Sequence, residues 1–252
     1  MTSSPFDQQI DRTAVPTMKW DPDKLAEFYD NREALPFWVA DMDFPAPPSV
    51  VQRITHRAEH GVYGYGYQPD ALREAMLGWY VRRQNWTIDP ETVEQCPSVL
   101  NAIAVLIDQH TDEGDGVIVQ PPVFFEFRQV ITANKRRASK NRLKLVDGRY
   151  EMDFDDLEAQ LAKPKNKVMI ICNPHNPVGR VWTRYELTRA AELCKAHDVL
   201  LISDEIHGDI IYPPHTFTPA LTLPESLHSH IVACLSPAKT FNIAGMIDAR
   251  AS

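Results

Sequence analysis

Lys239 is the residue whose type and setting point most directly to chemistry. It lies in the run SPAKTFNIAG, residues 236–245, directly after the apolar, strand-like run Ile231–Leu235. Folds of the α/β class place their chemistry at the carboxyl ends of strands. A lysine amine becomes a nucleophile toward an aldehyde when burial or a nearby cation lowers its pKa. Taken alone, however, a lysine in such a run could equally be an ordinary exposed loop residue.

A second candidate is the turn after the apolar run Val168–Cys172. It reads NPHNPVG, residues 173–179, with two Asn-Pro steps and a glycine. Proline fixes φ and glycine permits a positive φ, so the turn is tight and the positions of Asn173 and Asn176 are well determined. An asparagine amide can donate to a phenolate oxygen. The alternative is an ordinary turn that ends a strand.

Asp204 is a third candidate, because it follows the apolar run Val199–Ser203 in the sequence SDEIH. An ionised aspartate beside a pyridine nitrogen keeps that nitrogen protonated. At an effective dielectric constant of about 20 and a separation of about 4 Å, the pair is worth roughly 4 kcal/mol. Protonation makes the ring a strong electron sink. A carboxylate that only caps the next turn is the alternative.

The sequence PSVL, residues 97–100, opens the amphipathic stretch Leu100–His110 and supplies a fourth candidate. Ser98 is a good N-cap, and the N–H groups of a helix's first turn form an anion site suited to phosphate. Serine is common at this position without any ligand. Together, the four segments offer an imine-forming lysine, an aspartate for a ring nitrogen, an asparagine for a ring oxygen and a phosphate site. Pyridoxal phosphate requires this set.

Sequence motifs along the chain resemble those of a known family. They are KWD (19–21), PFWVADMDF (36–44), HGVYGY (60–65), CNPHNPVGRVWT (172–183), SDEIH (203–207) and the run around Lys239. Their order and spacing are similar to those of fold-type I pyridoxal-phosphate enzymes of the aminotransferase class I/II superfamily. More narrowly, they resemble the cystathionine β-lyase (C–S lyase) subgroup.

The resemblance implies roles for individual residues. The catalytic lysine is Lys239, and the implied cofactor-binding residues are Lys239, Asp204, Asn176, His207, Ser236, Ser98, Val99, Leu100, Phe124 and Tyr65. Asp204 pairs with the pyridine nitrogen and Asn176 with the ring hydroxyl, while Ser236 and the start of the helix hold the phosphate. Phe124 stands where the family usually has a stacked tyrosine. Tyr65 resembles a tyrosine that reaches into the neighbouring subunit's site, which implies a homodimer.

The activity implied by the resemblance is cleavage of cystathionine or a cysteine S-conjugate to a thiol, pyruvate and ammonia. The same residues would serve an aminotransferase, so the site chemistry does not separate these activities. A truncated homologue that binds the cofactor without turnover is a third reading. A divalent-metal site is a fourth, formed by Asp204, Glu205, His207 and Asp209 with His175. It would leave Lys239 and the Asn-Pro turn without a role, and we expect no metal.

Apolar runs alternate with helical patterns along the chain, which predicts an α/β fold with a mostly parallel sheet covered by helices on both faces. Strands are expected at 117–120, 168–172, 199–203 and 231–235, and helices at 48–59, 69–84, 98–110, 153–162 and from Thr183. We expect an extended N-terminal arm at 1–47, forming part of the small domain and substrate entrance. A pyridoxal-phosphate-binding large domain is expected at 48–252.

The resemblance also implies that the chain is a fragment, because members of the family continue further. The C-terminal small domain, with the arginine that grips the substrate carboxylate, would be missing, and the large domain would be incomplete at its end. We therefore expect the sheet to lack the strand that follows Lys239, and the 252-residue chain to have little activity.

Composition narrows the function classes. The 252 residues are 44% hydrophobic and 24% charged, with a net charge of −8. These values are ordinary for a globular protein and argue against a general binder of nucleic acid or anionic membranes. The four cysteines are scattered, the N-terminus lacks the pattern of a signal peptide, and no apolar run has the length of a membrane span. We expect reduced thiols and a cytoplasmic protein that acts on a small amino acid.

Overall fold

The computed structural model describes residues 4–67, 69–246 and 249–251. The chain forms two compact units. We call them the arm unit, which comprises the described residues up to Gly66 together with Ala238–Met246, and the sheet unit, which comprises the described remainder. Each unit is described by itself. The domain boundary expected between residues 47 and 48 stays a prediction.

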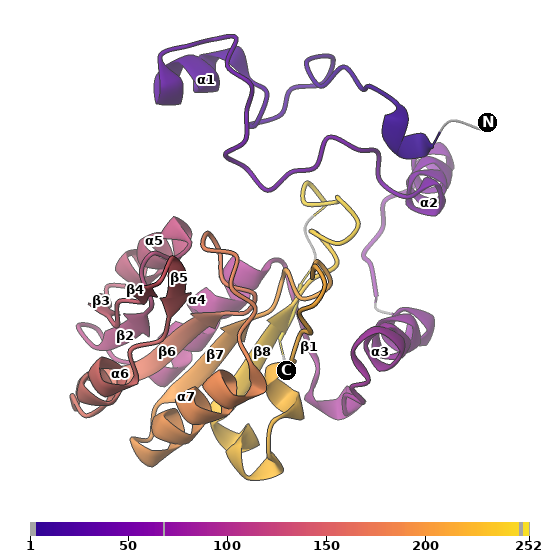
Figure 1. Cartoon of the computed structure of the whole chain (residues 1–252). Coiled ribbons are helices and arrows are strands. Elements are labelled where there is room, and N and C mark those ends of the chain that lie inside the picture. The colour runs from indigo at the N-terminus through magenta and orange to yellow at the C-terminus, as the bar shows by residue number, and fades with distance from the viewer. Residues whose placement is uncertain (1–3, 68, 247–248, 252) are drawn as a thin grey trace. The chain divides into compact units, whose positions relative to one another are not determined.

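The sheet unit is built on a seven-stranded sheet with the order β1-β9-β8-β7-β6-β2-β3 (Figure 1). Its strands are β1 (Glu94–Cys96), β2 (Gly116–Val119), β3 (Arg137–Lys140), β6 (Asn166–Cys172), β7 (Leu200–Asp204), β8 (Ile231–Leu235) and β9 (Ala249–Ala251). From β3 through β2, β6 and β7 to β8, all neighbouring strands pair in parallel. β9 pairs antiparallel with β8 and with β1. A separate antiparallel hairpin consists of β4 (Lys144–Val146) and β5 (Arg149–Glu151).

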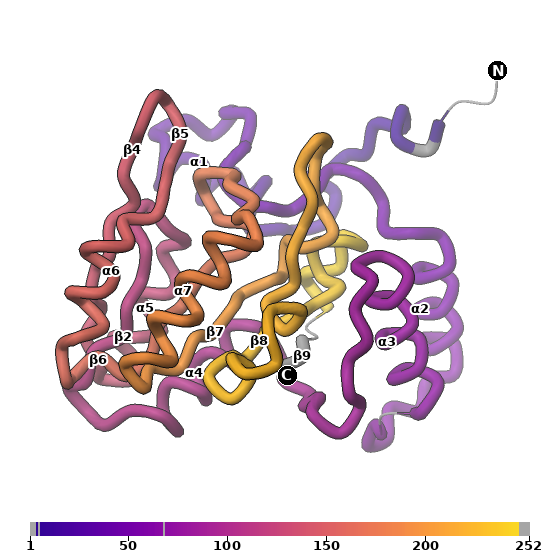
Figure 2. The backbone as a smooth tube through the Cα atoms, turned by 60° about the horizontal axis from the view of Figure 1, so that its bottom comes forward, coloured from indigo at the N-terminus to yellow at the C-terminus, as the bar shows by residue number. Residues whose placement is uncertain are grey.

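Successive residues of the central strands point to opposite faces of the sheet, and each face has its own apolar core. Ile170 of β6 belongs to the core that includes residues of α4 (Val99–His110) and α5 (Phe125–Ala133). Ile171, the next residue, belongs to the core that includes residues of α6 (Phe154–Leu161) and α7 (Arg184–Ala196). Figure 2 shows α6 and α7 running beside each other over the sheet. The predicted parallel sheet with helices on both faces is confirmed.

Local signals in the sequence set the helix starts that were expected. Ser98 caps α4, because its Oγ accepts a hydrogen bond of 3.1 Å from the Asn101 N–H. Thr183 and Glu186 form a reciprocal capping box at the start of α7. The predicted strand 231–235 coincides with β8, and the other predicted strands agree with β2, β6 and β7 within one or two residues.

Several elements were not expected from the sequence. The predicted extended arm contains the helix α1 (Pro22–Tyr29), which begins at a proline after the N-cap Asp21. The short strands β1 and β3 and the helix α5 were also missed. The expectation that the sheet lacks a strand after Lys239 is wrong, since β9 follows that lysine and lies between β8 and β1. A three-residue strand is recognised by the partners it pairs with, which the sequence does not display.

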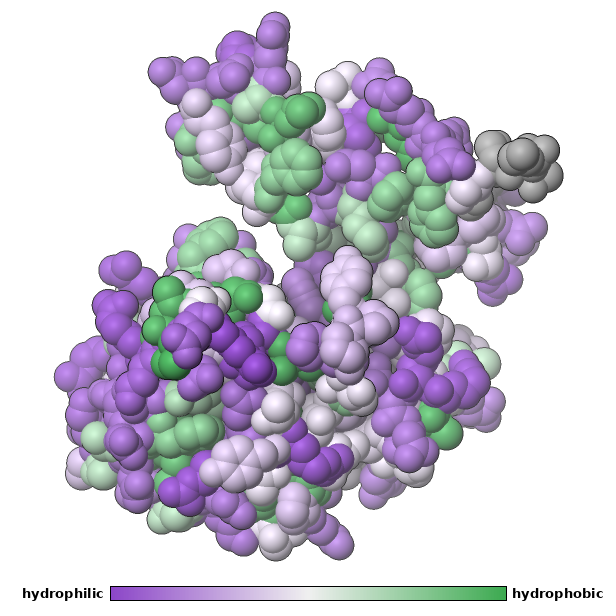
Figure 3. All heavy atoms as spheres, in the orientation of Figure 1, coloured by the Kyte–Doolittle hydropathy of each residue, from purple (hydrophilic) through white to green (hydrophobic). Residues whose placement is uncertain are grey.

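Two long helices lie between the arm and the sheet in sequence. α2 (Pro48–His60) belongs to the arm unit and ends at Gly61, whose φ of 71° is left-handed. α3 (Asp70–Gln84) belongs to the sheet unit. Both agree with the predicted helices 48–59 and 69–84. Many apolar side chains of the arm unit are exposed, and Figure 3 shows them as green spheres at the surface of the N-terminal segments. The described residues also form short 3₁₀ helices, which are η1 (Pro5–Asp7), η2 (Pro90–Thr92), η3 (Ala220–Thr222) and η4 (Glu225–His230).

Candidate active site

The register of the parallel strands brings three predicted site residues to one edge of the sheet. Asp204, the last residue of β7, is paired with Cys172 of β6 and with Cys234 of β8. Asn176 lies in the turn that follows Cys172, and Ser236 comes two residues after Cys234. Because the carboxyl ends of these strands share an edge, an aspartate, an asparagine and a serine from distant parts of the sequence meet there.

Asp204 is buried, with 5% of its surface exposed, although it is a carboxylate. Its Oδ1 accepts a hydrogen bond of 3.1 Å from the Ile206 N–H, so it does cap the turn that follows the strand. A charged carboxylate this deeply buried is stable only when it is paired or hydrogen-bonded. The capping role proposed as the alternative is therefore present, and it fixes the carboxylate in a defined orientation.

The start of α4, predicted to hold a phosphate, belongs to the same unit. Ser98 caps the helix, and Val99 and Leu100 are the first two helical residues. The N–H groups of a first helical turn have no acceptor inside the helix, and the helix dipole adds a partial positive charge there. α4 contacts β6, β7 and β8, the strands that carry Asn176, Asp204 and Ser236 at their ends.

The Asn-Pro turn is rigidly hydrogen-bonded and separates the roles of its two asparagines. The His175 N–H donates to the Arg180 carbonyl at 2.7 Å, and the Asn173 N–H donates to the Asp204 carbonyl at 2.8 Å. The Asn173 side chain donates to the Thr218 carbonyl at 3.0 Å. The Asn173 side chain therefore stabilises the turn through its bond to Thr218. Asn176 is the asparagine of this turn that is suited to bind a ligand.

His175 joins this turn to the loop that carries Phe124. Its Nε2 lies 2.9 Å from the Pro122 carbonyl, and its ring packs edge-on against Trp182 with a centroid distance of 5.4 Å. Burial lowers the pKa of His175, so the ring is neutral and Nε2–H is the donor. Phe124 precedes α5 and makes edge-on contact with Phe127 at 5.6 Å. From the sequence, His175 was predicted only as a metal ligand, and this positioning contact was not expected.

Glu205 is a second buried carboxyl group, directly after Asp204. Its Oε1 accepts hydrogen bonds from the Ser203 hydroxyl at 2.9 Å and from the Ala220 N–H at 2.7 Å. Burial, together with the nearby charge of Asp204, raises the pKa of Glu205 to about 8, although these hydrogen bonds act to lower it. Glu205 is thus neutral near pH 7 and adds little charge beside Asp204.

The metal reading finds no support in the described part of the chain. No group of three or more His, Cys, Asp or Glu side chains is arranged there to hold a metal ion. Glu205 is engaged by Ser203 and Ala220, while Asp209 accepts hydrogen bonds from Trp79 Nε1 at 2.9 Å and Gln84 Nε2 at 3.1 Å. His207 lies two residues after Glu205 in the sequence.

Lys239 lies in the arm unit, where it is partly buried rather than freely exposed. Its Nζ donates a hydrogen bond of 2.8 Å to the Ala40 carbonyl. Tyr65, also in the arm unit, is fully exposed in the single chain. The site residues predicted from the sequence are therefore divided: Lys239 and Tyr65 belong to one unit and the others to the sheet unit.

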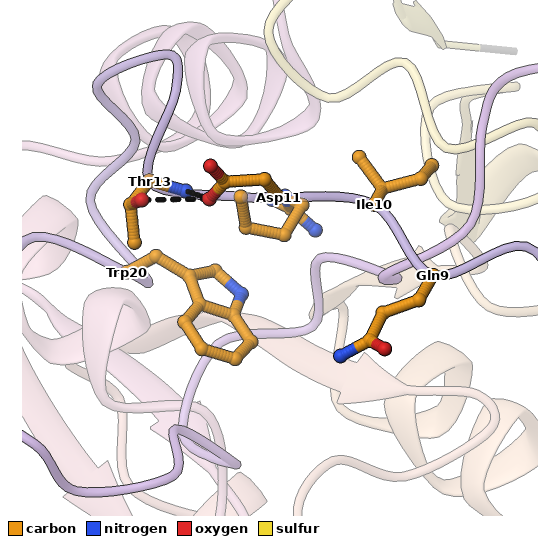
Figure 4. A pocket seen from close by; sticks show the side chains of 6 residues that line it. Gln9, Ile10, Asp11, Thr13 and Trp20 are labelled. Atoms are coloured by element: carbon orange, nitrogen blue, oxygen red, sulfur yellow. Dashed lines mark hydrogen bonds between the residues drawn. The ribbon is translucent and has the colours of Figure 1, made fainter.

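A pocket of about 430 Å³ in the arm unit contains none of the predicted site residues. It is lined by Gln9–Thr13 and Trp20. Figure 4 shows the hydrogen bond between the Asp11 carboxylate and Thr13, which both line the pocket. Its one cation, Arg12, is already paired with Asp41 at 2.8 Å and with Asp43 at 2.5 Å. We do not assign the active site to this pocket.

The polar groups on the sheet unit fit pyridoxal phosphate. The start of α4 suits a dianionic phosphate, the buried Asp204 carboxylate suits a protonated ring nitrogen, and the Asn176 amide suits a ring oxygen. The sheet order, the helices on both faces and the polar residues at the strand ends define the α/β fold of pyridoxal-phosphate-dependent transferases.

Comparison with known proteins gives the family. The chain belongs to the aminotransferase class I and II family, which matches residues 33–247. It is 40% identical to cystathionine beta-lyase PatB of Bacillus subtilis over 241 residues, covering 96% of this chain and 62% of that protein. It is 37% identical to protein MalY of Escherichia coli, covering 83% of this chain and 54% of MalY.

Solved structures agree with the sequence relatives. Cystalysin from Treponema denticola, described as containing a pyridoxal 5′-phosphate cofactor, superposes with a TM-score of 0.90 at 32% identity, covering 97% of this chain and 62% of cystalysin. The pyridoxal-phosphate-bound C–S lyase from Staphylococcus hominis superposes with a TM-score of 0.89 at 30% identity, covering 99% of this chain and 63% of the lyase. This chain thus spans about three fifths of the length of these relatives. Within its described residues, no helix is long and apolar enough to cross a membrane.

Proposed function

We propose that this chain is the cofactor-binding part of a pyridoxal-phosphate-dependent C–S β-lyase. The observation that carries the proposal is the register of Asp204 with Cys172 and Cys234. It brings a buried carboxylate, the Asn-Pro turn and Ser236 to the sheet edge where α/β folds bind ligands. The similarity to curated cystathionine β-lyases supports the choice of chemistry.

In this proposal the phosphate is held by Ser236 and the N–H groups of Val99 and Leu100, with Ser98 shaping the start of the helix. Asp204 faces the ring nitrogen and Asn176 the ring oxygen. His207 also belongs to the cofactor-binding set. Phe124 stacks on the ring face, and it offers the aromatic surface of a tyrosine without the hydroxyl. Lys239 binds the cofactor covalently through Nζ.

When bound, pyridoxal phosphate serves as an electron sink that makes the substrate's Cα proton acidic. The residues of this chain then have separate tasks. The Asp204 carboxylate would face the ring nitrogen, where a negative charge favours the protonated ring. Lys239 Nζ would accept the Cα proton of the substrate. A thiolate at Cβ of the substrate would then leave as the thiol, and water would hydrolyse the remaining three-carbon fragment to pyruvate and ammonia.

An aminotransferase is the alternative activity, because the same residues could return the proton to a different carbon. Cystathionine beta-lyase PatB is 40% identical to this chain, whereas a mouse kynurenine–oxoglutarate transaminase is 30% identical, and this difference favours cleavage of cystathionine or a cysteine S-conjugate. We also propose a cytoplasmic homodimer in which Tyr65 reaches the neighbouring site. The division into an arm at 1–47 and a cofactor-binding domain at 48–252 is part of the proposal.

The cofactor assignment is tested by borohydride reduction of the purified chain with pyridoxal phosphate. We expect the label on Lys239 in peptide mapping and a visible absorption band before reduction. The Lys239→Ala variant is the control and should lose both. Label distributed over surface lysines, or unchanged in the variant, contradicts the assignment.

The reaction is tested with cystathionine and a cysteine S-conjugate in a chain extended to the full length of the relatives. We expect equal amounts of pyruvate, ammonia and thiol without an added keto acid. A requirement for a keto acid would establish the aminotransferase instead. The 252-residue chain measured beside it shows how much of the activity this part carries, and we expect little. Comparable turnover by both chains would contradict that expectation.

A further inference from the structure

The loop that carries Lys239 contains an asparagine whose side chain is fully engaged by a distant backbone segment. Asn242 Nδ2 donates hydrogen bonds to the Met42 carbonyl at 3.0 Å and to the Phe44 carbonyl at 2.7 Å. Its Oδ1 accepts a hydrogen bond of 3.1 Å from the Met42 N–H. One amide group thus forms three hydrogen bonds to the segment 40–44, and both residues' loops belong to the arm unit.

Lys239 contacts the same segment. Its Nζ donates to the Ala40 carbonyl at 2.8 Å, two residues before Met42. The Ile243 N–H donates to the Ala238 carbonyl at 2.9 Å, which closes the loop between the lysine and the asparagine. The position of the carbonyl that receives the lysine amine therefore depends on the backbone that Asn242 holds.

The same segment is also held by charged residues. Arg12 donates to the Met42 carbonyl at 2.7 Å and pairs with Asp41 and Asp43. Lys19 donates to the Asp41 carbonyl at 2.6 Å and to the Asp43 carboxylate at 2.8 Å. Held by these charged residues, the segment can act as a stable support, and Asn242 links that support to the lysine loop.

The backbone of Asn242 also explains why the residue is an asparagine. Its φ of 52° is left-handed, a conformation that asparagine and glycine adopt more easily than other residues. Glycine would tolerate this backbone but would lack the amide. The choice of asparagine therefore meets a backbone requirement and a hydrogen-bonding requirement together.

We propose that Asn242 is a positioning residue for Lys239: it holds Met42 and Phe44 so that the Ala40 carbonyl restrains the lysine amine. The role rests on the proposed function, because the restraint matters when Nζ must bind the cofactor and later accept a proton. A flexible lysine side chain has many rotamers, and a fixed acceptor reduces them. Asn242 acts through the backbone and does not itself touch the reacting atoms.

The test measures the reactivity of the lysine amine in the chain without cofactor, by competitive reductive methylation and mass spectrometry. Lys195 is the internal reference, because it also donates to a backbone carbonyl, that of Ser226 at 2.6 Å. In Asn242→Gly the left-handed backbone is retained and the amide is lost. We expect methylation of Lys239 relative to Lys195 to rise about twofold to tenfold. This range corresponds to loss of the hydrogen bond from Lys239 Nζ to the Ala40 carbonyl.

The matched control is Asn85→Gly, because Asn85 is also left-handed, with a φ of 49°, and ends α3 in the sheet unit. It should leave the ratio unchanged. Hydrogen exchange of the peptide containing Met42 should accelerate in Asn242→Gly while β6 stays protected. An unchanged methylation ratio despite faster exchange at Met42 overturns the proposal, and so does loss of protection throughout the chain, which would make Asn242 a general folding residue.

The two proposals are separated by their readouts. If borohydride with pyridoxal phosphate fails to label Lys239, the cofactor assignment fails, whatever the methylation ratio. If Lys239 is labelled but Asn242→Gly leaves its reactivity unchanged, only the positioning role fails. In a full-length chain with both proposals correct, Asn242→Gly should lower kcat more than it raises KM.

Discussion

His175 Nε2 and the Pro122 carbonyl lie 2.9 Å apart, and this contact joins the loop after β6 to the loop after β2. The first loop carries Asn176 and the second carries Phe124, so the two residues proposed to touch the ring oxygen and the ring face are held by one buried imidazole. Burial lowers the pKa of His175, and the neutral ring donates to the carbonyl through Nε2–H.

Replacement of His175 by phenylalanine keeps a ring against Trp182 but leaves the Pro122 carbonyl without its donor. We expect a loss of about 1–3 kcal/mol in the free energy of unfolding, the cost of a buried unsatisfied polar group. His228→Phe is the matched control, because its Nε2 also lies 2.9 Å from a carbonyl, that of Leu223, at a half-buried position. Denaturant titration measures both, and equal losses would contradict the special role of His175.

The His175→Phe variant also tests how the free energy of unfolding depends on pH. The folded pKa of His175 lies below its unfolded value of 6.5, so the unfolded chain binds a proton first as the pH falls. Stability contributed by the neutral ring is present above pH 6.5 and is lost below it. In His175→Phe this loss should disappear. Parallel acid-stability curves for wild type and variant would show that another group is responsible.

Glu205 should have the opposite effect. Burial raises its pKa from 4.5 to about 8, so between these values the folded chain keeps a proton that the unfolded chain has released. Stability therefore falls as the pH rises through this window, by at most about 1.4 kcal/mol per pH unit. Glu205→Gln should flatten the curve between pH 5 and 8, whereas Glu192→Gln at an exposed position of α7 should not. An unchanged slope in Glu205→Gln would mean that the carboxyl is already ionised in the folded chain.

Asp204→Ala separates cofactor binding from chemistry. The phosphate contacts proposed at the start of α4 are unchanged by this substitution, so the variant should retain some pyridoxal phosphate. Without the carboxylate beside the ring nitrogen, exchange of the substrate α-proton should fall by several orders of magnitude, since roughly 4 kcal/mol of ion-pair energy corresponds to about a thousandfold. Deuterium exchange followed by NMR measures it. Normal exchange would leave Asp204 with the capping role alone.

The capping box of α7 gives a prediction about stability alone. Thr183→Ala removes the hydroxyl that accepts from the Glu186 N–H at 3.2 Å, and should cost about 1 kcal/mol. Thr188→Ala, inside the same helix, is the control and should change stability much less. Thermal unfolding compares them, and similar shifts would assign the effect to helix propensity instead.

Much of the sheet was predictable because its strands are continuous apolar runs. Ile231–Leu235 is buried on both faces, and its boundaries follow from its composition alone. Caps such as Ser98 and Thr183 are local too, because each bonds an N–H three residues away. The candidate lysine, aspartate and asparagine were recognisable because each follows such a strand.

Other features depend on partners that are distant in the sequence. β9 is a strand because it pairs with β8 and with β1, and its three residues alone do not predict that pairing. The engagement of Asn242 by Met42 spans 200 residues, and the pKa of Glu205 depends on how completely the fold removes its carboxyl from water. Sequence determined the central parallel strands, the capped helix starts and the residue types that follow those strands, because those signals are local. Tertiary structure decided which of these residues are held by one another, because burial and long-range hydrogen bonds exist only once the chain has folded.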